Sequence, residues 1–310
     1  MLAGVIGTGH LGYHHARILS ELTRKTVPVY DIDRDKMERL AGDLEIRPCN
    51  DLESLLDACE AVVVATTTSS HHEVVLRALD AGVHVLVEKP LASSTAEGHE
   101  MVEKAAEKNL ILAVGHVERF NPAIMAAAGL IENPMFVEGH RMAPFTERGT
   151  DVSVVFDLMI HDIDLVLSFI DSPVESVHAS GTAVLSSNAD IANARIGFRN
   201  GCVVNMTASR ISNDRIRKLR FFQHRRYVSV DFASRTVEAF GLTDGRIEPI
   251  PVDVPDKDAL TEELKDFIKA CSGGSAPTVT GEDGLKALTS AQVISGKIEE
   301  TFGSMAGSSK

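Results

Sequence analysis

The chain has 310 residues, of which 44% are hydrophobic and 24% are charged, a composition typical of a soluble globular protein with two domains. A net charge of -13 opposes binding to nucleic acid or to an anionic membrane, and no apolar run is long enough to span a bilayer. The four cysteines show neither metal-binding nor disulfide spacing, and the first strand leaves no room for a signal peptide. We therefore expect a cytoplasmic protein with free thiols and no metal site.

The first 118 residues alternate short apolar runs with helical stretches, which is the pattern of a doubly wound parallel sheet. The expected strands are residues 2–6, 27–30, 61–65, 83–87 and 110–114. The expected helices are residues 14–22, 33–40, 52–58, 70–81 and 95–108. Ligands of such sheets bind beyond the carboxyl ends of the strands, so functional residues are expected there.

The first strand runs into the glycine-rich turn Gly7-Thr8-Gly9-His10-Leu11-Gly12. In a dinucleotide-binding turn the first glycine permits the tight bend and the second lets the backbone approach a pyrophosphate. The third lets the helix pack closely on the strand, and the amides at the start of the helix face the phosphates. A purely structural turn is the alternative, but the flanking strand and helix favour a bound dinucleotide.

The second strand stops at Asp31, about 20 residues beyond the last glycine, where a carboxylate can accept hydrogen bonds from a ribose diol. The same carboxylate repels a 2′-phosphate, which favours NAD over NADP. Arg34 lies close enough in the sequence to keep NADP open as the less favoured cofactor.

The strand at residues 83–87 delivers Glu88-Lys89-Pro90 to the same edge of the sheet. Lys89 could be a solvated loop charge, but its position beside the expected nicotinamide favours a functional role. A desolvated lysine near a cationic ring has a lowered pKa, which suits proton transfer to or from an alcohol oxygen.

Beyond residue 118 the pattern changes to strands joined by polar turns, with Asn200-Gly201 as a hairpin signal. The expected strands are residues 135–141, 194–198, 202–207, 219–222, 227–232 and 237–240. The expected helices are residues 123–130, 156–170, 259–271 and 283–302. The predicted fold class is α/β, with a Rossmann domain at residues 1–118 and an α+β domain containing a large, mainly antiparallel open sheet at residues 119–310.

Polar residues interrupt the apolar helix expected at residues 156–170. Asp157 and His161 are four residues apart and therefore share one face of that helix. Buried polar groups need partners, which a substrate cleft would supply. A histidine bonded to its neighbouring acid in the core is the alternative.

These motifs resemble, in order and spacing, those of the Gfo/Idh/MocA oxidoreductase family. The matching stretches are the glycine-rich turn, Ala65-Thr66-Thr67-Thr68-Ser69-Ser70-His71, the block ending in Glu88-Lys89-Pro90, and the Asp157–His161 pair. The resemblance implies an alcohol–ketone reaction on a sugar or cyclic polyol, with NAD as the cofactor and the active site between the two domains. Thr67 departs from the family, whose members usually carry proline there.

The resemblance also implies roles for individual residues. Lys89 would contact the nicotinamide ribose and the reacting hydroxyl, His161 would be the general base, and Asp157 would hold the sugar or orient that base. The cofactor would be lined by Thr66, Thr67, His71 and Glu88, although His71 could instead cap its own helix. Arg119 and Asn121 are candidate substrate contacts.

The stretch from Gly115 to Pro122, with Pro144-Phe145 and residues 148–152, resembles a bacterial subgroup of the family. Its members include enzymes that oxidise the 3-hydroxyl of UDP-N-acetylglucosamine. A diphosphate needs cations, and Arg148, Arg210 and Arg215 are candidates. The basic run at residues 215–226 is otherwise a solvated strand face.

Other functions remain open at this point. One is a dehydrogenase or reductase of a free polyol, a dihydrodiol or another non-sugar carbonyl, and another is a non-catalytic NAD-binding regulator. The absence of tryptophan and the presence of only three tyrosines disfavour large aromatic substrates. The joint presence of Lys89, Asp157 and His161 disfavours the regulator. The open face of the antiparallel sheet predicts a homodimer or homotetramer.

Overall fold

The computed structural model describes residues 1–146 and 152–307, which form two compact units. The first unit contains Met1–Val117 and Asp258–Leu285, and the second contains Glu118–Lys257 and the residues from Lys286 on. The sequence-based division at residue 118 differs from this for residues 258–285, which it assigned to the second domain. The reason is packing: Leu264 and Phe267 of helix α8 (Ala259–Cys271) are buried in the core of the first unit.

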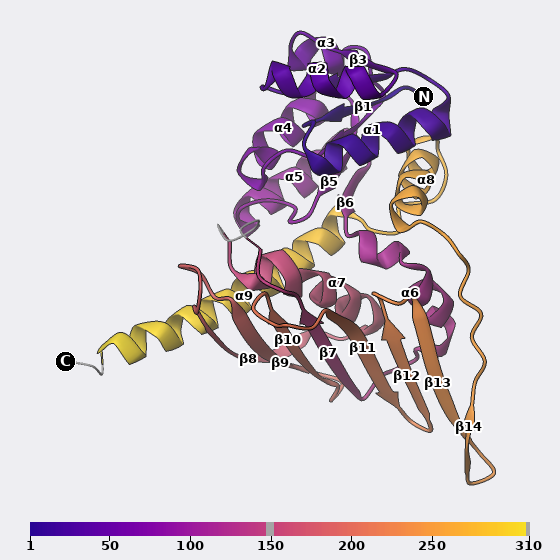
Figure 1. The fold of residues 1–310 in the computed structure, drawn as a ribbon, viewed down its shortest axis with the longest axis vertical. Coiled ribbons are helices and arrows are strands. Elements are labelled where there is room, and N and C mark those ends of the chain that lie inside the picture. Colours follow the sequence, from indigo (N-terminus) through magenta and orange to yellow (C-terminus); the bar gives the residue numbers. More distant parts are fainter. Residues whose placement is uncertain (147–151, 308–310) are drawn as a thin grey trace. The chain divides into compact units, whose positions relative to one another are not determined.

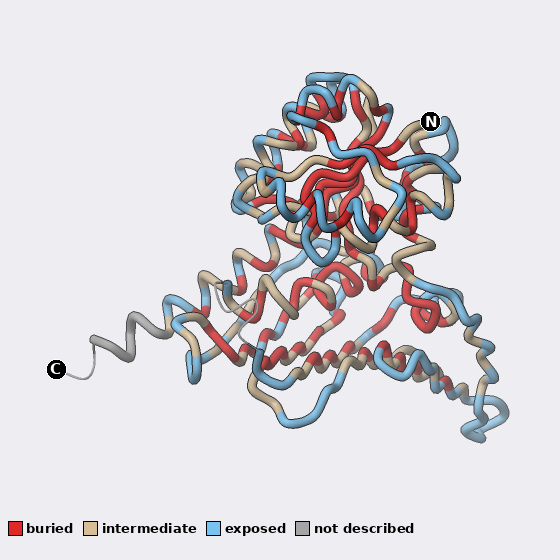
Figure 2. The backbone as a smooth tube through the Cα atoms, turned by 45° about the horizontal axis from the view of Figure 1, so that its top comes forward, coloured by how far each residue is buried: buried red, intermediate tan, exposed pale blue. Residues whose placement is uncertain are grey.

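The first unit is built on a parallel six-stranded sheet with the strand order β3-β2-β1-β4-β5-β6 (Figure 1). Its strands are β1 (Ala3–Ile6), β2 (Val27–Tyr30), β3 (Ile46–Pro48), β4 (Ala61–Val64), β5 (His84–Glu88) and β6 (Leu112–Gly115). Every residue of β1 and β4 is buried, because helices cover both faces of the sheet (Figure 2). The expected Rossmann sheet is confirmed.

Short and medium-length helices connect these strands. They are α1 (His10–Thr23), α2 (Arg34–Asp43), α3 (Leu52–Leu56), α4 (Thr68–Asp80) and α5 (Thr95–Lys108). Helices α1 and α8 pack together on one face, and α4 and α5 pack against each other next to β4 and β5. Helix α5 begins with a capping box in which Ser94 and Glu97 each bond to the other's backbone amide.

The second unit is built on an eight-stranded sheet with the order β14-β13-β12-β11-β7-β10-β9-β8. Its strands are β7 (Phe136–Met142), β8 (Val174–Thr182), β9 (Ile191–Phe198), β10 (Val203–Ser209), β11 (Ile216–Gln223), β12 (Arg226–Asp231), β13 (Thr236–Thr243) and β14 (Arg246–Pro249). The pairing of β7 with β10 is parallel and the other pairings are antiparallel. The mainly antiparallel sheet is therefore confirmed, as is the hairpin turn at Asn200-Gly201, where Gly201 has a φ of 87°.

Helices cover one face of this sheet (Figure 1). They are α6 (Pro122–Ala127), α7 (Ile160–Phe169) and α9 (Gly281–Gly307), with 3-10 turns η1 (Val117–Phe120) and η2 (Ala128–Leu130) and a π-helical turn η3 (Val155–Met159). Alternate residues of β7, β9 and β10 are buried beneath these helices. The other face is more exposed, which gives the strands their period of two.

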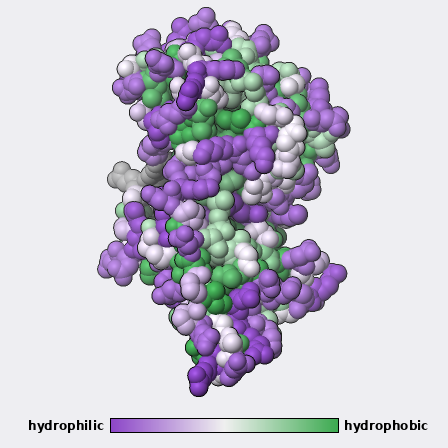
Figure 3. All heavy atoms as spheres, turned by 90° about the vertical axis from the view of Figure 1, so that its right-hand side faces the viewer, coloured by the Kyte–Doolittle hydropathy of each residue, from purple (hydrophilic) through white to green (hydrophobic). Residues whose placement is uncertain are grey.

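The elements expected from the sequence are present with displaced ends, and β3, β8 and β14 are additional. Each additional strand lies at a sheet edge and is mostly exposed, so none has a clear apolar pattern. Within the described residues no helix is long and apolar enough to cross a membrane. Figure 3 shows a surface on which apolar side chains lie in separate groups among hydrophilic ones.

Candidate active site

The glycine-rich turn joins β1 to α1 in the first unit, and each of its glycines has a different surrounding. Gly7 has a φ of 91°, and a side chain there would meet the backbone of Ala65 at 2.7 Å. A side chain at Gly12 would collide with the carbonyl oxygen of Gly7, so only glycine lets α1 start this close to β1. Gly9 faces open space, and no side chain in the described structure caps the first amides of α1. The turn therefore leaves backbone amides for a phosphate.

Asp31 follows β2 and is held in place by the same turn. Its Oδ2 accepts hydrogen bonds from the Thr8 backbone amide at 2.6 Å and from the Thr8 hydroxyl at 2.9 Å. Its Oδ1 accepts a third from the Asp33 amide at 2.9 Å. Three donors fix the carboxylate, so its remaining lone pairs have a defined direction.

A pocket of about 360 Å³ lies at this edge of the sheet, a volume in the range of small-molecule sites. Its walls are Ile6, Gly7, Gly9, Tyr30, Asp31, Ile32, Lys36, Ala65, Thr66, Thr67, Ser70 and Val74. The predicted residues Gly7, Gly9, Asp31, Thr66 and Thr67 are thus brought together. The glycine turn, the open amides and the fixed carboxylate fit the pyrophosphate and ribose of a dinucleotide.

Lys36 was not predicted as part of this pocket. It lies in the first turn of α2, with Nζ 3.4 Å from a carboxylate oxygen of Asp33, the N-cap of that helix. The sequence did contain a signal for Lys36, because it lies about one helical turn after Asp33, the N-cap of the helix that follows β2. Lys36 places a cation at the rim where an adenosine ribose would lie.

His71 ties two loops at the carboxyl end of the sheet. Nδ1 lies 3.0 Å from the carbonyl oxygen of Pro90, and Nε2 lies 3.3 Å from that of Thr66. Burial lowers the pKa of His71, and a neutral ring carries one N–H, so it donates to one of these two carbonyls at a time. It does not line the described pocket, and neither do the predicted residues His10, Leu11, Gly12, Glu88 and Lys89.

Glu88 and Lys89 follow directly from the buried strand β5 and have different surroundings. Glu88 is buried, and its Oε1 lies 2.7 Å from Nε2 of His15 on α1. Lys89 is half-buried at the end of the strand. The backbone thus presents Lys89 at the sheet edge where the Rossmann fold binds its ligand.

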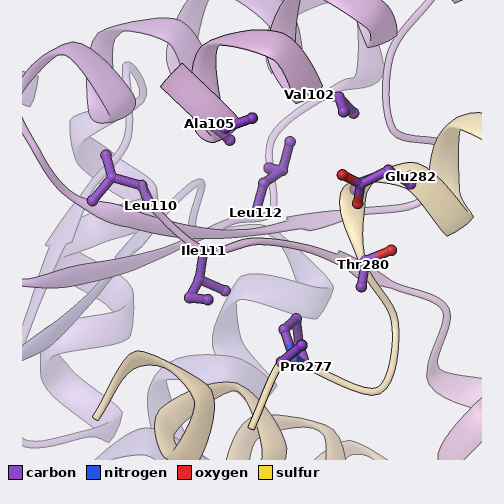
Figure 4. A pocket seen from close by; sticks show the side chains of 11 residues that line it. Val102, Ala105, Leu110, Ile111, Leu112, Pro277, Thr280 and Glu282 are labelled. Carbon is purple, nitrogen blue, oxygen red and sulfur yellow. The ribbon is translucent and has the colours of Figure 1, made fainter. Parts of the chain in front are cut away.

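A second pocket in the first unit, of about 180 Å³, is lined mainly by apolar side chains of α5, β6 and residues 276–282 (Figure 4). Thr280 and Glu282 are the polar groups labelled at it, and they come from the chain entering α9. This pocket holds none of the predicted site residues.

Asp157 and His161 lie in the second unit at the junction of η3 and α7. Both are half-buried, whereas their neighbours Met159 and Ile160 are fully buried. The π-helical turn contains Asp157 and widens the backbone just before His161, a feature often found at functional sites. The sequence offered no signal for this turn.

Two ion pairs anchor the first turn of α7. They use Asp162 and Asp164, which follow His161 closely in the sequence. Asp162 Oδ1 lies 2.7 Å from Nη2 of Arg141, whose Nη1 also bonds to Glu118 at 2.8 Å. Burial by itself would lower the pKa of Arg141, but the two carboxylates outweigh burial and raise the pKa, so the guanidinium stays charged. Arg119 forms a two-bond pair with Asp164, at 2.7 and 3.0 Å. Sequence reasoning missed Asp162 and Asp164 as the groups that fix the backbone beside His161.

Several predicted substrate contacts are used inside the second unit. The Arg119 guanidinium is engaged by Asp164, and buried Asn121 caps α6 while its amide donates to Glu118 at 3.1 Å. Arg210 is buried and donates to the Val152 carbonyl at 2.5 Å. This position argues against the predicted role of Arg210 in binding a diphosphate. Arg148 lies outside the described residues. The substrate roles of Arg119 and Asn121 stay predictions.

Comparisons with known proteins match both units. Residues 1–116 match the model of an oxidoreductase family with an NAD-binding Rossmann fold, and residues 125–226 match the Gfo/Idh/MocA C-terminal domain. The expectations of an NAD-dependent dehydrogenase are thereby confirmed.

Relatives cover nearly the whole chain. A UDP-N-acetylglucosamine 3-dehydrogenase of Acidithiobacillus ferrooxidans is 36% identical over 307 residues, which is 96% of this chain and 97% of that protein. Its solved structure superposes with a TM-score of 0.92, covering 97% of this chain and 98% of that one. A myo-inositol 2-dehydrogenase of Thermotoga maritima is 25% identical over 97% of both chains. The chain therefore belongs to the Gfo/Idh/MocA family of oxidoreductases.

Proposed function

We propose that this protein oxidises the 3-hydroxyl of UDP-N-acetylglucosamine, or of a closely related UDP-sugar, with NAD. The observation that carries the proposal is the 36% identity to a UDP-N-acetylglucosamine 3-dehydrogenase across 96% of the chain. The inositol dehydrogenases among the relatives are either 25–28% identical over 93–97% of the chain or 32–34% identical over 57–67% of it.

The chemistry divides between the cofactor and three side chains. NAD, when bound, supplies the acceptor for the hydride that leaves the sugar carbon. His161 accepts the proton of the reacting hydroxyl, and Asp157, one turn earlier, orients the imidazole or the sugar. Lys89 hydrogen-bonds the same hydroxyl and polarises it, since an ammonium stabilises the negative charge that develops on the oxygen. The anchoring of α7 by Asp162 and Asp164 holds His161 in one position.

The diphosphate of a nucleotide sugar needs a cation. We assign Arg148 to this role as a proposal, with Arg215, which is exposed, as the second candidate. Arg119 and Asn121 are the proposed sugar contacts, and this role requires the sugar to replace their bonds to Asp164 and Glu118.

A panel of substrates tests the proposal. Purified protein with NAD is assayed for absorbance of the reduced nicotinamide with UDP-N-acetylglucosamine, UDP-glucose, free N-acetylglucosamine and myo-inositol. We expect kcat/KM for UDP-N-acetylglucosamine to exceed that for the free sugar by about 100-fold or more, since two phosphates contribute charge-assisted hydrogen bonds. Faster turnover of myo-inositol would replace the proposal with a polyol dehydrogenase. Absence of turnover with all four would contradict it.

We also propose a homodimer or homotetramer assembled through the exposed face of the eight-stranded sheet. Phe136, Phe222, Tyr227 and Phe240 form a row of ring contacts across four strands, with centroid separations of 5.1 to 6.3 Å. Exposed aromatic rows of this kind are enriched at interfaces. Light scattering should give at least the dimer mass, and Phe222→Glu should reduce it. A monomer at all concentrations would contradict this assembly.

The proposed compartment is the cytoplasm. The four cysteines are free, and burial raises the pKa of Cys59 to about 12, so this thiol stays protonated and unreactive. Free buried thiols are typical of a reducing compartment. Fractionation of the producing cells, with a periplasmic marker as control, tests this assignment.

A further inference from the structure

Three ionisable side chains from distant parts of the sequence meet in the interior of the first unit. His15 comes from α1, Glu88 from the end of β5 and Glu263 from α8. One nitrogen or oxygen of each lies within 4.8 Å of the others, and their exposed fractions are 0%, 8% and 2%. The active-site chemistry proposed above uses neither His15 nor Glu263.

The bonding in this cluster is incomplete. The contact between His15 and Glu88 uses Nε2 and Oε1. Within the described residues, Nδ1 of His15 and both carboxylate oxygens of Glu263 have no hydrogen-bond partner. Buried polar atoms are nearly always bonded, so unbonded atoms on two residues of one cluster, whose ligand atoms lie within 4.8 Å of one another, indicate a missing partner.

The charges in the cluster are also unbalanced. Neither Glu88 nor Glu263 forms an ion pair with a lysine or arginine of the described structure. Two ionised carboxylates buried together destabilise the folded chain unless a cation lies beside them.

We propose that His15, Glu88 and Glu263 bind a divalent transition-metal ion of the Zn²⁺ class. One neutral imidazole and two carboxylates carry two negative charges, which such an ion balances. Zn²⁺ accepts this mixture of nitrogen and oxygen ligands and often takes three protein ligands with a water in the fourth position. Mg²⁺ and Ca²⁺ prefer sites made of oxygen alone, so the imidazole disfavours them.

The geometry is close to that of a bound state. Ligand atoms about 2.1 Å from a tetrahedral ion lie about 3.4 Å from one another, so the 4.8 Å span closes by small side-chain rotations. Bound metal would link α8, more than half the chain away in sequence, to α1 and to the strand that presents Lys89. The proposed ion is a structural link and takes no part in the proposed reaction.

The test uses tag-free protein stripped with a chelator, incubated with Zn²⁺ or Mg²⁺, desalted and analysed by mass spectrometry for metal. We expect wild type to retain roughly one Zn²⁺ per chain, no Mg²⁺, and a melting temperature that rises with Zn²⁺ and falls again with chelator. Glu263→Gln and His15→Gln should each bind Zn²⁺ at least about tenfold more weakly. Glu262→Gln, on the same helix with a carboxylate facing Lys265, is the matched control and should bind like wild type.

Equal Zn²⁺ retention by wild type and Glu263→Gln, or loss of Zn²⁺ in Glu262→Gln as well, would overturn the site. A wild type that retains no Zn²⁺ would also overturn it, and a higher melting temperature of Glu263→Gln would then indicate that the carboxyl pair shares a proton instead. Circular dichroism verifies that each variant is folded. The readout involves neither cofactor nor sugar, so its outcome is independent of the proposed enzymatic function.

Discussion

Replacing Asp31 with asparagine should abolish the preference of this enzyme for NAD over NADP. The side chain keeps its size, and its amide oxygen can still accept the Thr8 amide that now lies 2.6 Å from the carboxylate. What it loses is the negative charge at the wall of the cofactor pocket, where Lys36 is the neighbouring cation.

The magnitude follows from the charge on a 2′-phosphate. Two unit charges 4 Å apart interact by about 1 kcal/mol in water and by about 4 kcal/mol at an effective dielectric constant of 20. A phosphate carrying about two charges is therefore opposed by about 2 to 8 kcal/mol. Taking the lower value, Asp31→Asn should shift the ratio of kcat/KM for NADP to that for NAD by at least about 30-fold.

The assay is initial rates with a saturating sugar substrate at varied NAD and varied NADP. Asp35→Asn, which removes the same charge from an exposed position in the first turn of α2, is the matched control and should leave the ratio unchanged. A ratio in Asp31→Asn within about threefold of wild type would refute the assigned role of Asp31, since about 0.7 kcal/mol lies below any expected repulsion.

Three further predictions concern the reaction and the stability of the two units. Lys89→Ala should abolish turnover but leave NADH affinity, measured by fluorescence titration, within about tenfold, because backbone contacts to the pyrophosphate dominate binding; near-normal kcat would exclude Lys89 from proton handling. Phe267→Ala should lower the urea unfolding free energy of the first unit by about 3–5 kcal/mol, and a loss below about 1 kcal/mol would argue that α8 is not part of its core. Burial alone would raise the pKa of Asp190, but amides of residues 184–186 and the Ser186 hydroxyl lower it, so its stabilisation is present above about pH 4 and is lost as the pH falls further. The stability advantage of wild type over Asp190→Asn should therefore shrink from pH 6 to pH 3, and a constant difference would contradict this.

The Rossmann unit could be predicted because its signals are local. Gly12 is required by the nearby carbonyl oxygen of Gly7, and Gly7 by its own φ of 91°, although the backbone closest to it is that of Ala65 after β4. Asp31 directly follows the strand β2, where an acid is expected. The assignment of α8 could not be predicted, because its apolar stripe with Leu264 and Phe267 would fit against either unit. Helical periodicity shows that a face is buried, not which sheet buries it.

The second unit shows the same limit more strongly. The alternation in β7 and β10 predicts strands, but their parallel pairing depends on the order of the whole sheet. Asp162 stood in the sequence beside His161 without any sign of Arg141, which comes from β7 and neutralises it. The cluster of His15, Glu88 and Glu263 was invisible for the same reason, because ligand spacing along the chain identifies only sites built from neighbouring residues.

The most direct test of the central claim follows the hydrogen on the sugar carbon that bears the reacting hydroxyl. UDP-N-acetylglucosamine carrying deuterium at C3 is incubated with the enzyme and NAD, and the reduced cofactor is analysed by mass spectrometry. The account predicts that the NADH formed carries the deuterium and that the sugar becomes the 3-keto product. Formation of unlabelled NADH would contradict the account. So would the absence of NADH when the protein is folded and binds NAD.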